Sequence, residues 1–206
     1  MNAESELERT AAVVRCRGIS HLLIVTLRVG GAPIDGPASA FTRRVTEWVM
    51  GTPEQRLVEL GITVPPPSPP AGLYRGGVVV GQLLFLSGVG PLRPDGTFVT
   101  GKVGGTVGID EAREAARLNG LQLLGAIRAE VGTLDAVVRV VKVLGMVNCA
   151  PGFNQTPTVI DGCSQLFVDV FGEAGRGARS AVGMAELPFD IAVEIEAVFE
   201  LRAIPS

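Results

Sequence analysis

The pattern of apolar and polar positions is clearest near the C-terminus, where nine residues from Val193 to Leu201 alternate. Strict alternation is typical of a β-strand with one face on a core. The apolar face holds Val193, Ile195, Ala197, Phe199 and Leu201, and the other face holds Glu194, Glu196, Val198 and Glu200. Residues 179–185 predict a second strand, and Pro188 and Asp190 favour a turn between the two. We therefore predict a β-hairpin over residues 178–201 at the end of a sheet, with Arg179 at the start of one strand and the glutamates on its neighbour.

Two upstream stretches have helical spacing. A long helix is predicted from Asp110, which can cap it, to about Val131, because its apolar residues recur on one face. Gly120 on this helix is expected to permit a close approach to the sheet. A second helix is predicted over residues 159–171, and Gly172 ends it.

Further strands are predicted over residues 78–80, 83–87, 98–100 and 137–147. Gly81-Gln82 and Pro94-Asp95-Gly96 provide turn signals between the first three. Arg139 and Lys142 interrupt the valine-rich fourth strand, and we expect them to point toward solvent or a neighbouring subunit. The order of the elements predicts an α+β fold, a mixed β-sheet with two helices packed on one face.

The region before this domain is predicted in two parts. Residues 1–49 are an extension of uncertain status, with a possible helix over 3–15 and a possible strand over 22–29. Arginine greatly outnumbers lysine, which suggests GC-rich coding and an open frame running upstream of the true start. We hypothesise that Met50 is the native initiator; the alternative is a real, partly ordered arm.

Residues 50–71 should form a short helix followed by a proline-rich arm. Thr52-Pro53-Glu54-Gln55 is a capping box with proline at the first helical position, and the helix should end near Gly61. The prolines between Pro65 and Pro70 predict an extended polyproline segment, which we interpret as a stiff spacer.

Composition limits the classes of function. A chain of 206 residues with 47% apolar content can bury one substantial core. Its net charge of −3 gives no electrostatic reason to expect nucleic acid or an anionic membrane as partner. The three cysteines, Cys16, Cys149 and Cys163, show no CxxC spacing, so a reducing cytoplasm is the simplest interpretation. No apolar run is long enough to span a bilayer, and the acidic N-terminus does not resemble a signal peptide.

Several kinds of chemistry are disfavoured by the residues available. The single histidine, His21, lies in the extension, which argues against a histidine-based triad or histidine general base in the core. No Cys/His cluster suits zinc, so we expect no metal site. The glycine-rich segment 104–108 lacks the residues of a phosphate-binding loop and is interpreted as a flexible loop, with phosphate binding a distant second. Cys149 and Cys163 lack basic neighbours that would activate a thiol.

Two motifs carry a family resemblance. Arg179-Ser-x-Val-x-x-x-x-Leu-Pro followed by Val-Glu-Ile-Glu-Ala resembles the C-terminal signature of the YjgF/YER057c/UK114 family, also called the Rid family. Phe85-Leu-Ser-Gly88 resembles its first long strand, and Tyr74 stands thirteen residues before Ser87, where members often have a tyrosine. The resemblance covers about residues 73–201. A less characterised branch is the most similar, on the motifs Asn148-x-Ala-Pro-Gly-Phe153 and Gly162-x-Ser-x-Leu166.

The resemblance implies a chorismate-mutase-like fold over residues 72–206, usually a homotrimer with sites in clefts between subunits. It also implies a cytoplasmic, cofactor-free imine deaminase active in metabolite damage control. Such a hydrolase converts 2-aminoacrylate-type imines or enamines, released by pyridoxal-phosphate enzymes, to a 2-keto acid and ammonia.

The same resemblance assigns roles to individual residues. Arg179 would hold the substrate carboxylate, for which a guanidinium fork is well suited. Glu194, fifteen residues later, would position or activate water, and Glu196 is the alternative. Ala181 stands where many deaminase members have cysteine, a position that the family uses through its backbone.

Tyr74 and Ser87 would shape the substrate pocket. Each candidate has a structural alternative: Tyr74 could anchor the proline-rich arm, Ser87 could satisfy a backbone group, and Arg179 could pair with a glutamate on an adjacent strand.

Two other functions compete with the deaminase. One is a trimeric protein that binds a small keto acid in the same pocket without turnover. The other is an endoribonuclease, which the negative charge and the lack of a core histidine disfavour. We expect a small carboxylate-bearing partner and neither nucleic acid nor membrane.

Overall fold

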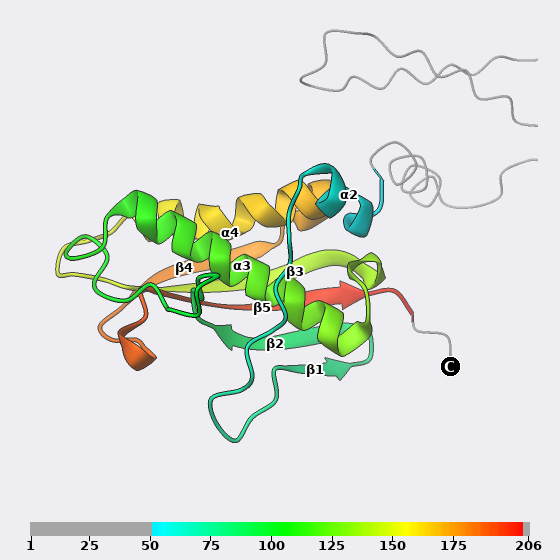
Figure 1. The fold of residues 1–206 in the computed structure, drawn as a ribbon, viewed down its shortest axis with the longest axis horizontal. Coiled ribbons are helices and arrows are strands. Elements are labelled where there is room, and N and C mark those ends of the chain that lie inside the picture. Colours follow the sequence, from blue (N-terminus) through cyan, green and yellow to red (C-terminus); the bar gives the residue numbers. More distant parts are fainter. Residues whose placement is uncertain (1–50, 204–206) are drawn as a thin grey trace, which may run out of the picture. The chain divides into compact units, whose positions relative to one another are not determined.

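The computed structural model describes residues 51–203 and shows a five-stranded sheet with helices on one face (Figure 1). The predictions for residues 1–49 lie outside the described residues. The helices are α2 (Pro53–Glu59), α3 (Ile109–Val131) and α4 (Thr156–Phe171). The strands are β1 (Gly77–Val80), β2 (Leu83–Val89), β3 (Val137–Asn148), β4 (Ala178–Met184) and β5 (Val193–Leu201). Short 3₁₀ turns cover Leu134–Ala136, Gly172–Gly175 and Pro188–Asp190.

The strands lie in the order β1-β2-β5-β3-β4, and all neighbours are antiparallel except the parallel pair β3 and β4. The alternation predicted for β5 is confirmed, because all five apolar side chains of its core face are buried. The predicted hairpin is wrong. β3 lies between β4 and β5, so β5 is central and β4, with Arg179, is an edge strand.

The connection between β4 and β5 explains this arrangement. It crosses the end of β3, where the backbone N–H of Asn148 donates to the Ala192 carbonyl at 2.9 Å. The Asn148 side-chain amide also donates to Asp190 Oδ1 at 2.9 Å. A connection fastened to β3 in this way cannot form the tight turn that pairs two consecutive strands.

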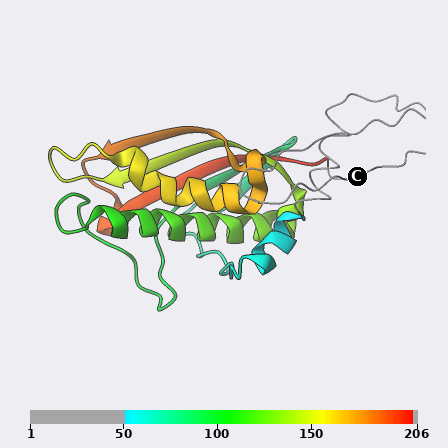
Figure 2. The same ribbon diagram turned by 90° about the horizontal axis from the view of Figure 1, so that it is seen from above.

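Helices α3 and α4 lie side by side beneath the same face of the sheet (Figure 2), as predicted. The expectation for Gly120 is wrong, since a Cβ there would lie 2.9 Å from Leu166 Cδ2 on α4, and not against the sheet. The N-cap of α3 is Gly108, and Asp110 lies in the first turn, where it complements the helix dipole. Gly172 ends α4 as predicted.

The segment before the sheet packs on α3. The capping box of α2 is present, and Gly61 follows the helix with a φ of 64°. The proline-rich arm is not a free spacer: Ser68 N–H donates to Gln122 Oε1 at 3.2 Å, and a Cβ at Gly125 would overlap the Pro65 carbonyl. The arm therefore covers part of α3.

The segment that links β2 to α3 has no regular strand. The predicted strand over residues 98–100 is reduced to two isolated bridges, Leu92 with Phe98 and Thr100 with Ile191. Among the described helices, none combines the length and the apolar character that a bilayer crossing requires.

Candidate functional site

Arg179 lies on the edge strand β4 and reaches toward helix α4. Its partner in the β3–β4 register, Val143, is in the core, so both side chains lie on the helix-covered side of the sheet. The Arg179 Nη1 donates to Asp161 Oδ1 at 2.7 Å and to Ser164 Oγ at 2.9 Å. Within residues 51–203, its Nε and Nη2 have no hydrogen-bond partner. The acidic partner is thus on α4, and not a glutamate on an adjacent strand.

Glu194 lies on the opposite face of the sheet, which no helix of the described residues covers and which is called the uncovered face below. Its neighbours Val193 and Ile195 are fully buried in the core, so the Glu194 side chain points the other way. A Cβ added at Gly88 would overlap Glu194 Oε1, which shows that the carboxylate lies directly against this glycine. Burial raises the pKa of Glu194, and the negative charge of Glu196 raises it further. A half-buried carboxylate of this kind can exchange protons closer to neutral pH than an exposed one.

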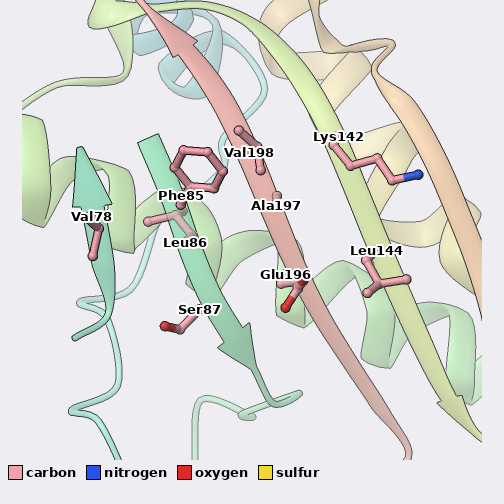
Figure 3. A pocket seen from close by; sticks show the side chains of 9 residues that line it. All are labelled: Val78, Phe85, Leu86, Ser87, Lys142, Leu144, Glu196, Ala197 and Val198. Atoms are coloured by element: carbon pink, nitrogen blue, oxygen red, sulfur yellow. The ribbon is translucent and has the colours of Figure 1, made fainter. Parts of the chain in front are cut away.

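Glu196 and Ser87 line a shallow pocket of about 270 Å³ on the same uncovered face (Figure 3). The Ser87 hydroxyl points away from Glu196 and donates to the Arg75 carbonyl at 2.7 Å. Lys142 points toward β4 and donates to Ser180 Oγ at 2.7 Å. Ser87 therefore satisfies a backbone carbonyl, the structural alternative, and its oxygen lone pairs remain for a ligand.

Tyr74 and Ala181 do not line this pocket. Tyr74 lines a separate groove of about 410 Å³ between the proline-rich arm and α3, and its hydroxyl accepts from Ala71 N–H at 3.1 Å. It therefore contacts the arm. Ala181 follows Arg179 by two residues on β4, and its carbonyl accepts from Thr156 Oγ1 at 3.0 Å.

A single chain does not bring all candidates together. Arg179 and Ala181 share the helix-covered side of β4, whereas Glu194, Glu196 and Ser87 share the uncovered face. Two strand spacings, about 10 Å, also separate β4 from β5.

Sequence reasoning missed several contacts of these residues. Of the two residues that hold Arg179, Ser164 belongs to the branch motif on α4 and Asp161 directly precedes it, but nothing in the sequence indicates that this helix faces β4. Gly88 follows the candidate Ser87, and only the fold shows the carboxylate packed on it. Asn119 is a polar residue on the apolar face of α3, and this break in the apolar pattern is a signal that the sequence does contain.

The described residues offer little for a metal or thiol chemistry. Within residues 51–203, no group of three His, Cys, Asp or Glu side chains could hold a metal ion. Burial raises the pKa of the Cys149 thiol and, more strongly, that of the fully buried Cys163. Both thiols are therefore weak nucleophiles at neutral pH.

Comparison with known proteins agrees with the fold. The family model described as "YjgF/chorismate_mutase-like, putative endoribonuclease" matches residues 54–199. Protein TCP17 of Trypanosoma cruzi is 42% identical over 147 residues, which cover 71% of this chain and 92% of that protein.

Two solved structures are similar over nearly their full length. Atu1372 of Agrobacterium tumefaciens, a protein with unknown function, has a TM-score of 0.66 at 38% identity, covering 78% of this chain and 98% of that one. A protein of Shewanella oneidensis, described as a "putative endoribonuclease", has a TM-score of 0.70 at 28% identity, covering 73% of this chain and 100% of that one. The family match over most of the chain shows that this protein belongs to the YjgF/chorismate mutase-like family, the Rid family that the Arg179 and Glu194 motifs resemble.

Proposed function

We propose that the protein is a cofactor-free cytoplasmic deaminase that hydrolyses small 2-imino acids. Water adds to the carbon of the C=N bond, and the resulting carbinolamine loses ammonia to leave a 2-keto acid. One general base takes a proton from the attacking water and delivers it to the imine nitrogen. It then transfers the hydroxyl proton of the carbinolamine to the amino group, which leaves as ammonia. Orientation and exclusion of bulk water supply most of the rate enhancement, because these imines already hydrolyse slowly in water.

The hydrogen bonding of Arg179 is the observation that carries this proposal. Asp161 and Ser164 both bind the same nitrogen, Nη1, and hold the guanidinium in place. The edge formed by Nε and Nη2 remains available, and a fork of two parallel donors matches a carboxylate. A quarter-exposed, anchored arginine with one free edge is well suited to bind a small acid.

Glu194 is the proposed base. Its burial and its raised pKa suit a group that must accept a proton from water near neutral pH. Its position against Gly88 limits the rotamers of the carboxylate, which favours a defined position for the attacking water.

The site is proposed to form between subunits of a homotrimer. Arg179 and Glu194 lie on opposite faces of one sheet, so one small substrate can contact both only if they come from different copies. The uncovered face supports such an assembly, since its apolar side chains are exposed: Val78 by 48%, Val80 by 60% and Phe85 by 44%.

The test is a coupled assay in which 2-iminopropionate is generated in situ and its hydrolysis is followed. The wild type should accelerate hydrolysis over the buffer rate, and Arg179→Ala should lose the acceleration. Arg176→Ala is the matched control, because Arg176 is an exposed arginine on the same segment, paired with Glu173. Equal rates with and without well-folded wild type would refute the proposal.

A second candidate, a keto acid binding protein without turnover, is favoured by one observation. Arg179 already has an acidic partner in Asp161, and within its own chain the proposed base, Glu194, lies on the other face of the sheet. Binding of pyruvate by the wild type without imine hydrolysis would select this function. An endoribonuclease is the weaker alternative: its test is RNA binding at low salt, which the net charge of −3 disfavours.

A further inference from the structure

Asn119 is a buried amide on α3, and it contacts the residue before Glu194 from the helix-covered side of the sheet. Its side chain is fully buried, and Nδ2 donates to two backbone carbonyls, Val89 at 2.6 Å and Val193 at 3.1 Å. Its Oδ1 is also buried and has no partner within the described residues. A buried oxygen without a hydrogen-bond partner costs free energy, so the presence of an amide side chain at this position needs an explanation.

The two carbonyls belong to strands that separate at this point. The β2–β5 register runs from Leu86–Ala197 to Val89–Ile195, so β2 advances by three residues while β5 advances by two. This is a bulge, and it contains Ser87 and Gly88. Val89–Ile195 is the last direct pair of β2 and β5. Beyond it, the Asn119 amide links the two strands from the helix-covered side of the sheet.

The hydrogen bond to Val193 bears directly on Glu194. The Val193 carbonyl and the Glu194 nitrogen belong to one planar peptide unit, so fixing the carbonyl also fixes the plane that leads into Glu194. The bond to Val89 holds the other side of the bulge, next to Gly88. Asn119 therefore restrains both the segment that bears the carboxylate and the glycine on which the carboxylate rests.

We propose that Asn119 is a positioning residue for the reaction: it sets the Glu194 carboxylate against Gly88 from the opposite side of the sheet. The catalytic part of this inference depends on the proposed function, whereas the geometric part does not. An asparagine suits the task because its –NH₂ group offers two donors from one short side chain.

The experiment compares Asn119→Leu with Gln122→Leu in the full-length protein. Both change a buried amide on α3 to a leucine of similar size, but Gln122 accepts hydrogen bonds from Ser68 in the proline-rich arm and contacts neither strand carbonyl. The principal readout is the pKa of Glu194, measured by NMR of carboxyl-labelled glutamate and assigned with Glu194→Gln. Melting temperature and kcat and KM for 2-iminopropionate are measured in parallel.

Asn119→Leu should lower the pKa of Glu194 toward its ordinary range, because a carboxylate released from Gly88 is better hydrated. It should also lower kcat by about tenfold or more, with KM changed by less than about threefold, since misplacement of the base acts on the chemical step. Gln122→Leu should leave the pKa, kcat and KM unchanged, even if both variants lower the melting temperature.

An unchanged Glu194 pKa in folded Asn119→Leu overturns the inference. If that variant does not fold, Asn119→Ala, which removes both donors without adding bulk on a helix rich in alanine, decides the question by the same criterion. A wild type without imine hydrolysis refutes the proposed function alone, because the NMR measurement still tests the position of the carboxylate.

Discussion

Arg179 and Asp161 form an ion pair between the edge strand β4 and helix α4, with 2.7 Å between Nη1 and Oδ1. The contact holds the guanidinium on the helix-covered side of the sheet and leaves its second edge free. It also places the negative charge of Asp161 beside the edge of Arg179 that is proposed to bind the substrate carboxylate.

We expect Asp161→Asn to strengthen binding of a carboxylate ligand. The variant keeps an oxygen that can accept from Nη1 but removes a charge that repels the ligand. Removal of one like charge near the surface is worth about 1 kcal/mol, or roughly fivefold in affinity. Calorimetric titration with pyruvate measures this change. Asp169→Asn, two turns along the same helix, alters net charge equally and serves as control; weaker binding by Asp161→Asn would show that its charge is needed to hold Arg179.

Mixing Arg179→Ala and Glu194→Gln subunits should restore imine hydrolysis. Each variant alone is expected to be inactive, since every site lacks one group. If the two residues meet between copies, random reassembly of a 1:1 mixture gives about a quarter of the sites both native residues. The measurement is activity after joint unfolding and refolding, with each variant refolded alone as control. No recovery in correctly assembled mixed trimers would show that Arg179 and Glu194 do not act together in one site.

The activity of the wild type should rise with pH through the raised pKa of Glu194, because the base must be ionised to accept a proton. Glu196→Gln removes the neighbouring negative charge and should move this acidic limb to lower pH. The limb should remain above the ordinary glutamate value of 4.5, because burial is the larger cause and persists. The pH dependence of kcat/KM tests this, with Glu200→Gln as control on the same strand. A limb that does not move in Glu196→Gln would exclude Glu194 as the titrating base.

Glu54 should stabilise the fold in a pH-dependent manner. It accepts from Arg128 Nε at 3.1 Å and from Leu134 N–H at 2.9 Å, which fastens α2 to the end of α3. The hydrogen bond from Arg128 is the main reason that its pKa is lowered in the folded state. The stabilisation is therefore present above the unfolded value of 4.5 and is lost as the pH falls through the lowered folded value.

Glu54→Gln should lower the free energy of unfolding at pH 7 by about 1 kcal/mol, a modest value because both partners are partly exposed. Urea titrations at several pH values measure the difference, which should shrink in acid. Glu59→Gln, an exposed glutamate on the same helix, should have little effect at any pH. If Glu54→Gln lowers the free energy of unfolding by the same amount at every pH, the ionised Glu54 carboxylate is not the cause of the stabilisation.

The elements of the fold were accessible from the sequence because their signals are local. The alternation of β5, the helical spacing of α3 and α4, the Gly172 stop and the capping box of α2 depend on neighbouring residues, and the structure confirms them. The arginine and glutamate motifs also sufficed to identify the family, which the family match confirms.

Strand pairing and side-chain contacts were not accessible in the same way. Alternation shows that a strand has a core face but does not select its partner, so two consecutive strands were predicted as a hairpin. The actual pairing depends on β3, thirty residues or more away in sequence, whose Asn148 fastens the connection between β4 and β5.

The sequence by itself determined the family, most of the helices and strands, and the candidate site residues, because these follow from local patterns. Only the tertiary structure decided that Arg179 lies on an edge strand beside Asp161, that Glu194 rests on Gly88 on the opposite face, and that Asn119 links β2 to β5. These contacts join segments distant along the chain. Their geometry depends on strand order and helix packing, which the whole core establishes together.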